Sequence, residues 1–212
     1  MKKTNAMRIL DKFNIKYEAC EYEDDTEHKL EHGAASRTAQ KLGINPEQVF
    51  KTIVFRAETK EILVFCQSAT SEINLKKARQ IANVREVSPI KEQELLSLTG
   101  YVRGGCSPIG MKKQFRTFID ESALLHDQIC ISAGVRGIQL KLSPEAVAIL
   151  QALSFPVRFV LIFTKTGPTL VDSLWLTLEL SKTRKESDAS HTVSSVSFLT
   201  WVLPCSTRML FS

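Results

Sequence analysis

Up to about residue 150, the hydrophobic positions alternate between a helical and a strand-like spacing. After Thr4, which can cap a helix, apolar residues recur at intervals of three at Met7, Leu10 and Phe13. Two runs rich in β-branched and aromatic residues, at 49–57 and 61–66, instead predict strands joined by a short turn. By the same criteria we predict further strands at 15–22, 101–105, 115–120, 128–133 and 138–142, and helices at 34–42, 73–82, 91–98 and 144–153.

These elements predict a mixed α/β domain. A doubly wound parallel sheet needs a helix between successive strands, and such crossovers are missing from 49–66 and from 101–142. We therefore predict a mixed, largely antiparallel, barrel-like sheet with flanking helices.

The composition changes near residue 152. Eight of the nine glycines precede it, and serine and threonine become frequent after it. We predict a domain at 1–151 and an extension at 152–212, in which the segment 181–195 has the composition of a flexible linker. The extension could cover a pocket, dock a partner or be a poorly ordered continuation of the chain. We favour the last, because the first domain looks complete without it.

Charge and cysteine content narrow the class of protein. The 212 residues include 28 Lys and Arg against 23 Asp and Glu, a net charge of +5, which permits contact with a polyanion without requiring it. No apolar run approaches the roughly 20 residues of a membrane-spanning helix, and no signal peptide is evident at the start. The five cysteines are irregularly spaced. We therefore expect a cytoplasmic protein with reduced thiols and no membrane contact.

A glycine-rich stretch at 104–110, GGCSPIG, is the first candidate for chemistry. Gly105 and Gly110 have the spacing of a phosphate-binding loop, but Met111 and Lys112 follow where that loop requires Lys and then Ser or Thr. This register argues against a nucleoside triphosphatase. The stretch can be a tight turn or the wall of a small pocket, and the two interpretations are compatible.

A second glycine loop lies at 132–137, SAGVRG. It places the hydroxyl of Ser132 close in sequence to the guanidinium of Arg136, which can bind a phosphate or a carboxylate. Alone, the loop could equally be a salt-bridged turn.

Three further features have a structural as well as a functional interpretation. Lys51 shares a strand face with apolar residues, so it either extends to solvent or supplies a cation to a pocket. Cys106 has no base nearby in the sequence, which favours packing over nucleophilic catalysis. His28 and His32 are spaced for one helix face, but two ligands do not complete a site, and we predict no metal.

Basic residues form two clusters. They are Lys76, Lys77 and Arg79, and Lys112, Lys113 and Arg116. Such clusters are usually solvated faces, although contacts with nucleic-acid phosphates need the same residues.

Three segments, in this order, carry a resemblance to a known family. The segments FKTIVF at 50–55, GYVRGGCSPIG at 100–110 and ISAGVRG at 131–137 resemble the signature of the bacterial Cys-tRNA(Pro) deacylases, the YbaK family. These proteins are stand-alone relatives of the editing domain of prolyl-tRNA synthetase. The resemblance covers about residues 1–151. It implies the YbaK/prolyl-tRNA synthetase editing-domain fold and a cytoplasmic hydrolase without metal or cofactor, which clears cysteine from mischarged prolyl-tRNA.

The resemblance also implies a set of site residues. The catalytic positions fall on Lys51, Gly104 and Ser132. Around them we expect substrate contacts from Tyr22, Thr52, Gly105, Ser107, Pro108, Gly134 and Arg136. We expect contacts with the tRNA backbone from Lys76, Lys77, Lys112 and Lys113.

The implied mechanism needs no built-in catalytic dyad, because an aminoacyl ester is already labile. The thiol of the cysteinyl substrate would attack its own ester carbonyl and expel the tRNA. Lys51 would hold the terminal adenosine or its phosphate, the Gly104 backbone the substrate amine or ester, and Ser132 the sugar or carbonyl.

Two alternatives stay open. One is a deacylase for Ala-tRNA(Pro) or another mischarged tRNA, and the other is a non-catalytic module that binds tRNA or a synthetase. The expected partners are the 3′ end of an aminoacylated tRNA and prolyl-tRNA synthetase. No oligomeric state is predicted.

Overall fold

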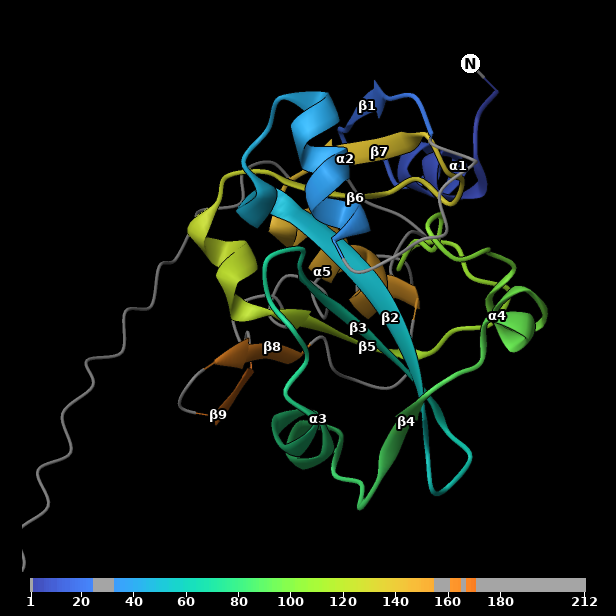
Figure 1. Ribbon diagram of the computed structural model, residues 1–212, viewed down its shortest axis with the longest axis vertical. Helices are drawn as coiled ribbons and strands as arrows, with labels where there is room; N and C mark the ends of the chain where they lie inside the picture. The colour runs from blue at the N-terminus through green and yellow to red at the C-terminus, as the bar shows by residue number, and fades with distance from the viewer. Residues whose placement is uncertain (1, 25–32, 155–160, 165–166, 171–212) are drawn as a thin grey trace, which may run out of the picture. The chain divides into compact units, whose positions relative to one another are not determined.

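The computed structural model describes residues 2–24, 33–154, 161–164 and 167–170, all within the compact unit Met1–Leu174 (Figure 1). The strands are β1 (Glu18–Glu21), β2 (Val49–Ala57), β3 (Ile62–Ser68), β4 (Val87–Pro89), β5 (Arg116–Asp120), β6 (Ile129–Ser132), β7 (Ile138–Leu142), β8 (Leu161–Thr164) and β9 (Gly167–Leu170). The α-helices are α1 (Asn5–Lys12), α2 (Ala34–Leu42), α3 (Leu75–Ala82), α4 (Glu92–Thr99) and α5 (Pro144–Ser154), and the 3₁₀ helices are η1 (Pro46–Gln48) and η2 (Glu121–Leu125).

The described strands form one mixed sheet. Its order is β1-β7-β6-β2-β3-β5-β8-β9, and β4 pairs with β2 beside this path. Most pairings are antiparallel, but β2 runs parallel to β6, β3 to β5 and β5 to β8. The predicted mixed α/β fold with a largely antiparallel sheet is therefore confirmed. No pairing among the described residues joins the edge strands β1 and β9, so the sheet is not closed into a barrel.

Helices cover both faces of the sheet, and the alternation of side chains along β2 explains which residues meet them. Phe50 packs in a core cluster with residues of α1 and α5, whereas its neighbour Val49 packs with Ala39 of α2 on the opposite face. Helix α3 lies on the α2 face, where Ala78 packs against Phe65. Figure 1 shows α2 in front of β2 and α5 behind it. The candidate site described below includes residues from α2 and from the sheet face that α2 covers.

Most predicted elements are confirmed, with ends shifted by a few residues. Thr4 caps α1, with its side chain accepting a hydrogen bond from the Met7 amide at 3.3 Å. Phe13 lies just past the end of α1 and is 37% exposed, so it does not continue the buried stripe. The predicted strand at 15–22 is shorter, because only Glu18–Glu21 pairs with β7.

The strand predicted at 101–105 is wrong. This segment is a turn in which the Gly105 amide donates to the Val102 carbonyl at 3.0 Å. Tyr101 and Val102 have high β propensity, but Tyr101 is buried as a packing residue between loops and Val102 is exposed. The three-residue strand β4 was not predicted, since a strand that short leaves no periodic pattern.

The described residues beyond α5 form the hairpin β8–β9, which pairs with β5. The boundary that we place between 151 and 152 stays a prediction. The linker predicted at 181–195 lies outside the described residues.

Candidate active site

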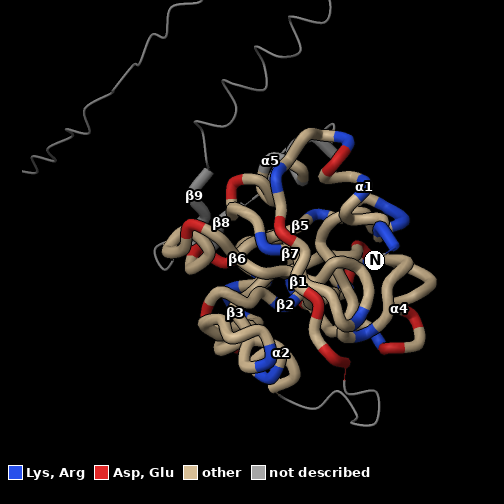
Figure 2. The backbone as a smooth tube through the Cα atoms, turned by 90° about the horizontal axis from the view of Figure 1, so that it is seen from above, with Lys and Arg blue, Asp and Glu red and all other residues tan. Residues whose placement is uncertain are grey.

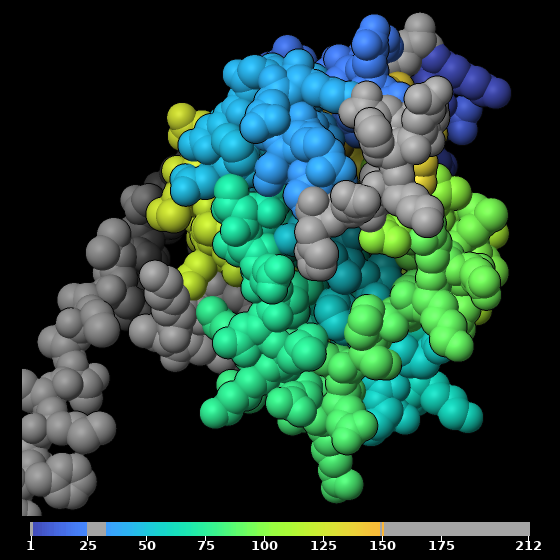
Figure 3. Space-filling model, viewed as in Figure 1, coloured from blue at the N-terminus to red at the C-terminus, as the bar shows by residue number. Residues whose placement is uncertain are grey.

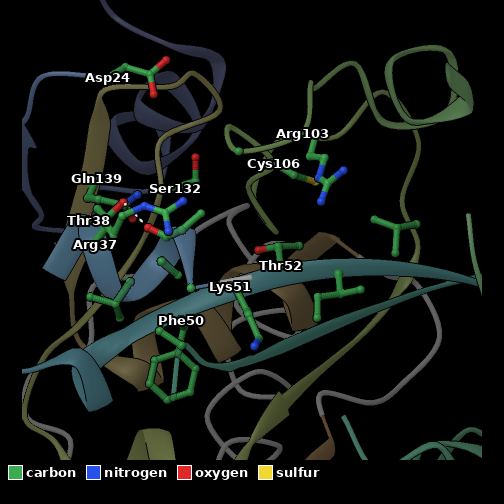
Figure 4. Close-up of a pocket in the computed structure, with 18 of the residues that line it drawn as sticks. Asp24, Arg37, Thr38, Phe50, Lys51, Thr52, Arg103, Cys106, Ser132 and Gln139 are labelled. Carbon is green, nitrogen blue, oxygen red and sulfur yellow. Dashed lines mark hydrogen bonds between the residues drawn. The ribbon is translucent and has the colours of Figure 1, made fainter. Parts of the chain in front are cut away.

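A cavity of about 520 Å³ lies where β2 and β6 separate. Its walls come from α2, β2, the ends of β6 and β7, and the segment between β4 and the first glycine loop. Figure 4 shows Thr38, Ser132 and Gln139 on one side of it and Cys106 on the other, with Thr52 of β2 between them. In Figure 3, atoms of β2 are visible between those of α2 and those of the segment after β4.

The register of the sheet brings Lys51 and Ser132 to one face. Val49 is paired with Cys130 in the parallel β2–β6 ladder, so the residues two positions further along both strands, Lys51 and Ser132, point to the same side. In the antiparallel β6–β7 ladder, Gln139 lies directly opposite Ser132. All three residues line the cavity, although Lys51 is far from the other two in the sequence.

Lys51 is a half-buried cation in this cavity. Burial lowers the pKa of its ammonium below the ordinary lysine value of 10.5, and the carboxylate of Glu72 offsets part of this effect. The described residues give the ammonium no hydrogen bond or ion pair. A desolvated cation of this kind is stabilised by an anionic or strongly polar ligand group.

Two buried oxygens in the same cavity also have no described partner. Ser132 is 8% exposed and Gln139 is 6% exposed, and neither the Ser132 Oγ nor the Gln139 Oε1 has a hydrogen-bond partner among the described residues. Leaving a buried polar group unpaired costs about 1–3 kcal/mol, so such groups usually face a ligand or water. The pair therefore marks the floor of the cavity as a binding surface.

The edge of β2 that borders the cavity includes backbone N–H and C=O groups that pair with no described strand. Pairing with β6 ends at Phe50, and pairing with β4 begins at Phe55. The Val54 carbonyl faces this edge, since it accepts from the Ile90 amide at 3.1 Å. Because every second residue of a strand faces the same edge, the N–H and C=O of Thr52 face it too, and no described strand pairs with them there. They are available to a ligand.

Tyr101 holds the two glycine loops together. Its hydroxyl donates to the carbonyls of Ile109 at 2.6 Å and Gly110 at 2.9 Å. Gly134, with φ +95°, lies against its ring, and a Cβ on Gly134 would stand 2.6 Å from Tyr101 Cε1. A Cβ on Gly105 would come within 2.9 Å of the Val135 backbone. The missing side chains thus let the two loops contact each other and place Gly104 in the cavity wall.

The predicted substrate-binding residues divide into two groups. Tyr22 and Thr52 line the cavity with the three predicted catalytic residues. The other five, Gly105, Ser107, Pro108, Gly134 and Arg136, are not among its lining residues. Their contacts support the wall: the Ser107 Oγ accepts from the Ile109 amide at 3.2 Å, and the Arg136 Nε donates to the Arg103 carbonyl at 2.8 Å. Direct substrate contact by these five stays a prediction.

The predicted basic clusters also lie away from the cavity lining. Lys77 on α3 is 3.9 Å from Glu121, the Lys112 ammonium donates to the Leu96 carbonyl at 3.2 Å, and Lys113 lines a separate small hollow. Lys76 is exposed on α3. The cations at the cavity are instead Arg37, Lys41, Lys51 and Arg103. Contact of the predicted clusters with tRNA stays a prediction.

Cys106 lines the cavity but is a poor nucleophile. Burial raises the pKa of its thiol to about 12, so it is not ionised at neutral pH. It packs with Val54 and Tyr101 in an apolar cluster. This environment agrees with a packing role.

We predict that Cys106→Ala changes kcat/KM for the deacylation implied by the motifs by less than about twofold, because a protonated buried thiol contributes no nucleophile. The loss of packing should lower the free energy of unfolding by about 1 kcal/mol. Both quantities are measurable by steady-state kinetics and urea unfolding. A thousandfold loss of activity would instead assign the thiol to catalysis.

Within the described ranges, no three His, Cys, Asp or Glu side chains are grouped as metal ligands, and no helix is long and apolar enough to cross a membrane. His28 and His32 lie outside those ranges.

The fold and the cavity define a mixed α/β protein with a polar site for a small ligand, and comparison with known sequences identifies the family. A family model described as "Aminoacyl-tRNA editing domain" matches residues 31–149, more than half of the chain. The chain belongs to this family, as the sequence motifs predicted.

One named relative agrees with this assignment, and a solved structure shares the fold. The chain is 38% identical to "Putative Cys-tRNA(Pro)/Cys-tRNA(Cys) deacylase EbsC" of Enterococcus faecalis (strain ATCC 700802 / V583) over 145 residues, which make up 68% of this chain and 86% of that protein. It is 24% identical to "Uncharacterized protein YwhH" of Bacillus subtilis (strain 168) over 127 residues, 59% of this chain and 79% of that protein. A crystal structure of "a putative trans-editing enzyme for prolyl tRNA synthetase" superposes with a TM-score of 0.60 at 21% identity, covering 70% of this chain and 90% of the other.

Proposed function

We propose that this protein is a trans-editing deacylase that removes cysteine from mischarged Cys-tRNA(Pro). The observation that carries the proposal is the meeting of Lys51, Gly104 and Ser132 in one cavity of a chain that belongs to the aminoacyl-tRNA editing family. The name of the E. faecalis relative supports the choice of amino acid. The cavity volume of about 520 Å³ suits a small ligand such as an aminoacylated adenosine.

The burial and charge of the site residues agree with the roles that the family resemblance implies. The half-buried ammonium of Lys51 would bind the terminal adenosine or its phosphate, and the Gly104 backbone would bind the substrate amine or ester. Ser132 has no described hydrogen-bond partner, hence no described base that could activate it as a nucleophile. Its hydroxyl, with the Gln139 amide beside it, would instead orient the sugar or the carbonyl.

The cavity favours chemistry by the substrate itself. Its described lining includes no histidine, and its carboxylates are Asp24 and Glu92, of which Glu92 is 3.2 Å from Arg103. In the proposed reaction, the sulfur of the cysteinyl group bonds to its own carbonyl carbon, the ester C–O bond breaks, and the thiol proton passes to the departing ribose oxygen. Water then opens the resulting thiolactone to free cysteine. The protein contributes orientation and charge stabilisation.

The partners follow from this chemistry. The cavity would bind only the 3′ end of the tRNA, so we propose that prolyl-tRNA synthetase supplies the selection of the tRNA body. The work of such an enzyme lies in the cytoplasm, where tRNAs are charged.

The proposal is tested by measuring deacylation of Cys-, Ser-, Ala- and Pro-tRNA(Pro) and of Cys-tRNA(Cys) by the full-length protein. We expect rapid release from Cys-tRNA(Pro) and far slower release from Ser-tRNA(Pro), in which oxygen replaces the attacking sulfur. Equal rates for the two would assign the attack to water or a ribose hydroxyl. Preference for Ala-tRNA(Pro) would support the alternative substrate, and binding without release would indicate a non-catalytic module.

A further inference from the structure

We infer that Arg37 of α2 and Arg103, on the opposite wall, form a phosphate clamp at the mouth of the cavity, which holds the backbone of the single-stranded tRNA 3′ end. The inference rests on the proposed function for the identity of the nucleic acid. It assigns binding of the tRNA backbone to two arginines that lie outside the basic clusters predicted from the sequence.

The first support is the order of residues from the mouth to the floor. Arg37 and Arg103 are exposed, Lys51 is half-buried, and Ser132 is buried, yet all four line one cavity. Figure 4 shows Arg37 on the side of Ser132 and Arg103 on the side of Cys106, with the cavity between them. In the inferred path, a strand whose aminoacylated end reaches Ser132 passes between the two guanidinium groups.

The second support is charge. The described lining carries four cations, Arg37, Lys41, Lys51 and Arg103, and two carboxylates, Asp24 and Glu92. Helix α2 contributes Arg37 and Lys41 at i and i+4, on one helix face, and has no acidic residue, as Figure 2 shows. Guanidinium groups bind phosphate with two parallel hydrogen bonds, which suits them to a backbone that must be positioned.

The third support is that the backbone of Arg103 is held in place, whereas its side chain can exchange Glu92 for a phosphate. The Arg136 Nε donates to the Arg103 carbonyl, which fixes the Arg103 backbone beside Gly104. The Arg103 side chain pairs with Glu92 at 3.2 Å, and both side chains are more than half exposed. Exposed pairs of this kind contribute little stability, so a phosphate can replace the Glu92 carboxylate.

The experiment measures binding of an uncharged RNA oligonucleotide ending in CCA by fluorescence anisotropy at several salt concentrations, with the full-length protein. We expect Arg37→Gln and Arg103→Gln each to weaken binding about tenfold. Each should also make the plot of log binding constant against log salt concentration less steep, by about 1 in slope. Arg85→Gln, an exposed arginine away from the cavity, is the matched control and should change neither quantity. Glu92→Gln should tighten binding, because it removes the carboxylate that competes with phosphate.

A second measurement separates phosphate binding from recognition of the amino acid. With Cys-tRNA(Pro), the two clamp variants should raise KM at unchanged kcat. With cysteinyl-adenosine, which lacks the phosphate, they should match the wild type.

Two results would overturn the clamp: equal losses with both substrates, or unchanged RNA binding in both variants while Lys76→Gln or Lys113→Gln lowers the salt slope. If the wild type fails to deacylate Cys-tRNA(Pro), the proposed function fails, but the RNA-binding result still tests the clamp.

Discussion

Replacing Lys51 with alanine is expected to lower kcat/KM for Cys-tRNA(Pro) by about 100-fold or more, without loss of the fold. Removing one preorganised charge-stabilising group from a desolvated site typically costs two to three orders of magnitude in rate. The fold should persist because Lys51 makes no described hydrogen bond or ion pair, and burial disfavours its charge. The unfolding midpoint should therefore stay the same or rise. Single-turnover deacylation and thermal unfolding give the two measurements.

Lys51→Arg is the matched control, since it keeps the charge. Because burial lowers the pKa of Lys51, the wild type should lose activity with rising pH below the ordinary lysine value of 10.5. The arginine variant stays charged across that range, so whatever activity it keeps should not show this alkaline loss. Wild-type turnover in Lys51→Ala would overturn the assignment of the site.

Local patterns predicted the elements well, whereas the pairing of distant strands could not be predicted. The hairpin of β2 and β3 follows from two β-rich runs and a short turn. The parallel β2–β6 ladder joins Val49 to Cys130 across 80 residues of chain, and no local period encodes such a contact. Yet this ladder is what aligns Lys51 with Ser132.

Residues from all three motifs line one cavity, but the sequence could not separate the lining of that cavity from its support. Gly104 and Gly105 are neighbours, yet Gly104 lines the cavity and Gly105 contacts the other loop. Gln139 was missed because it alternates with apolar residues in β7 and so resembles a solvent-facing position. Its burial and its unpaired oxygen arise only once neighbouring strands and α2 surround it.

Gly134→Ala is the change expected to destabilise the fold most. The residue has φ +95°, where a side chain costs about 1–2 kcal/mol. The new Cβ would also stand 2.6 Å from the buried Tyr101 ring, and overpacking of this kind costs about 1–3 kcal/mol. Tyr101 cannot withdraw without giving up its hydrogen bonds to Ile109 and Gly110. Urea unfolding should therefore show a loss of roughly 2–5 kcal/mol.

Gly43→Ala separates the two causes. Gly43 ends α2 at φ +65°, but nothing lies within 4 Å of its missing Cβ. Only the cost of placing a side chain on a left-handed backbone therefore applies, about 1–2 kcal/mol. The two variants should also differ in activity. Movement of Tyr101 shifts the wall that carries Gly104, so Gly134→Ala should lower kcat/KM about tenfold even where the protein is fully folded. Equal, small effects of the two substitutions would mean that the loops adjust freely, and that Tyr101 does not hold the wall in place.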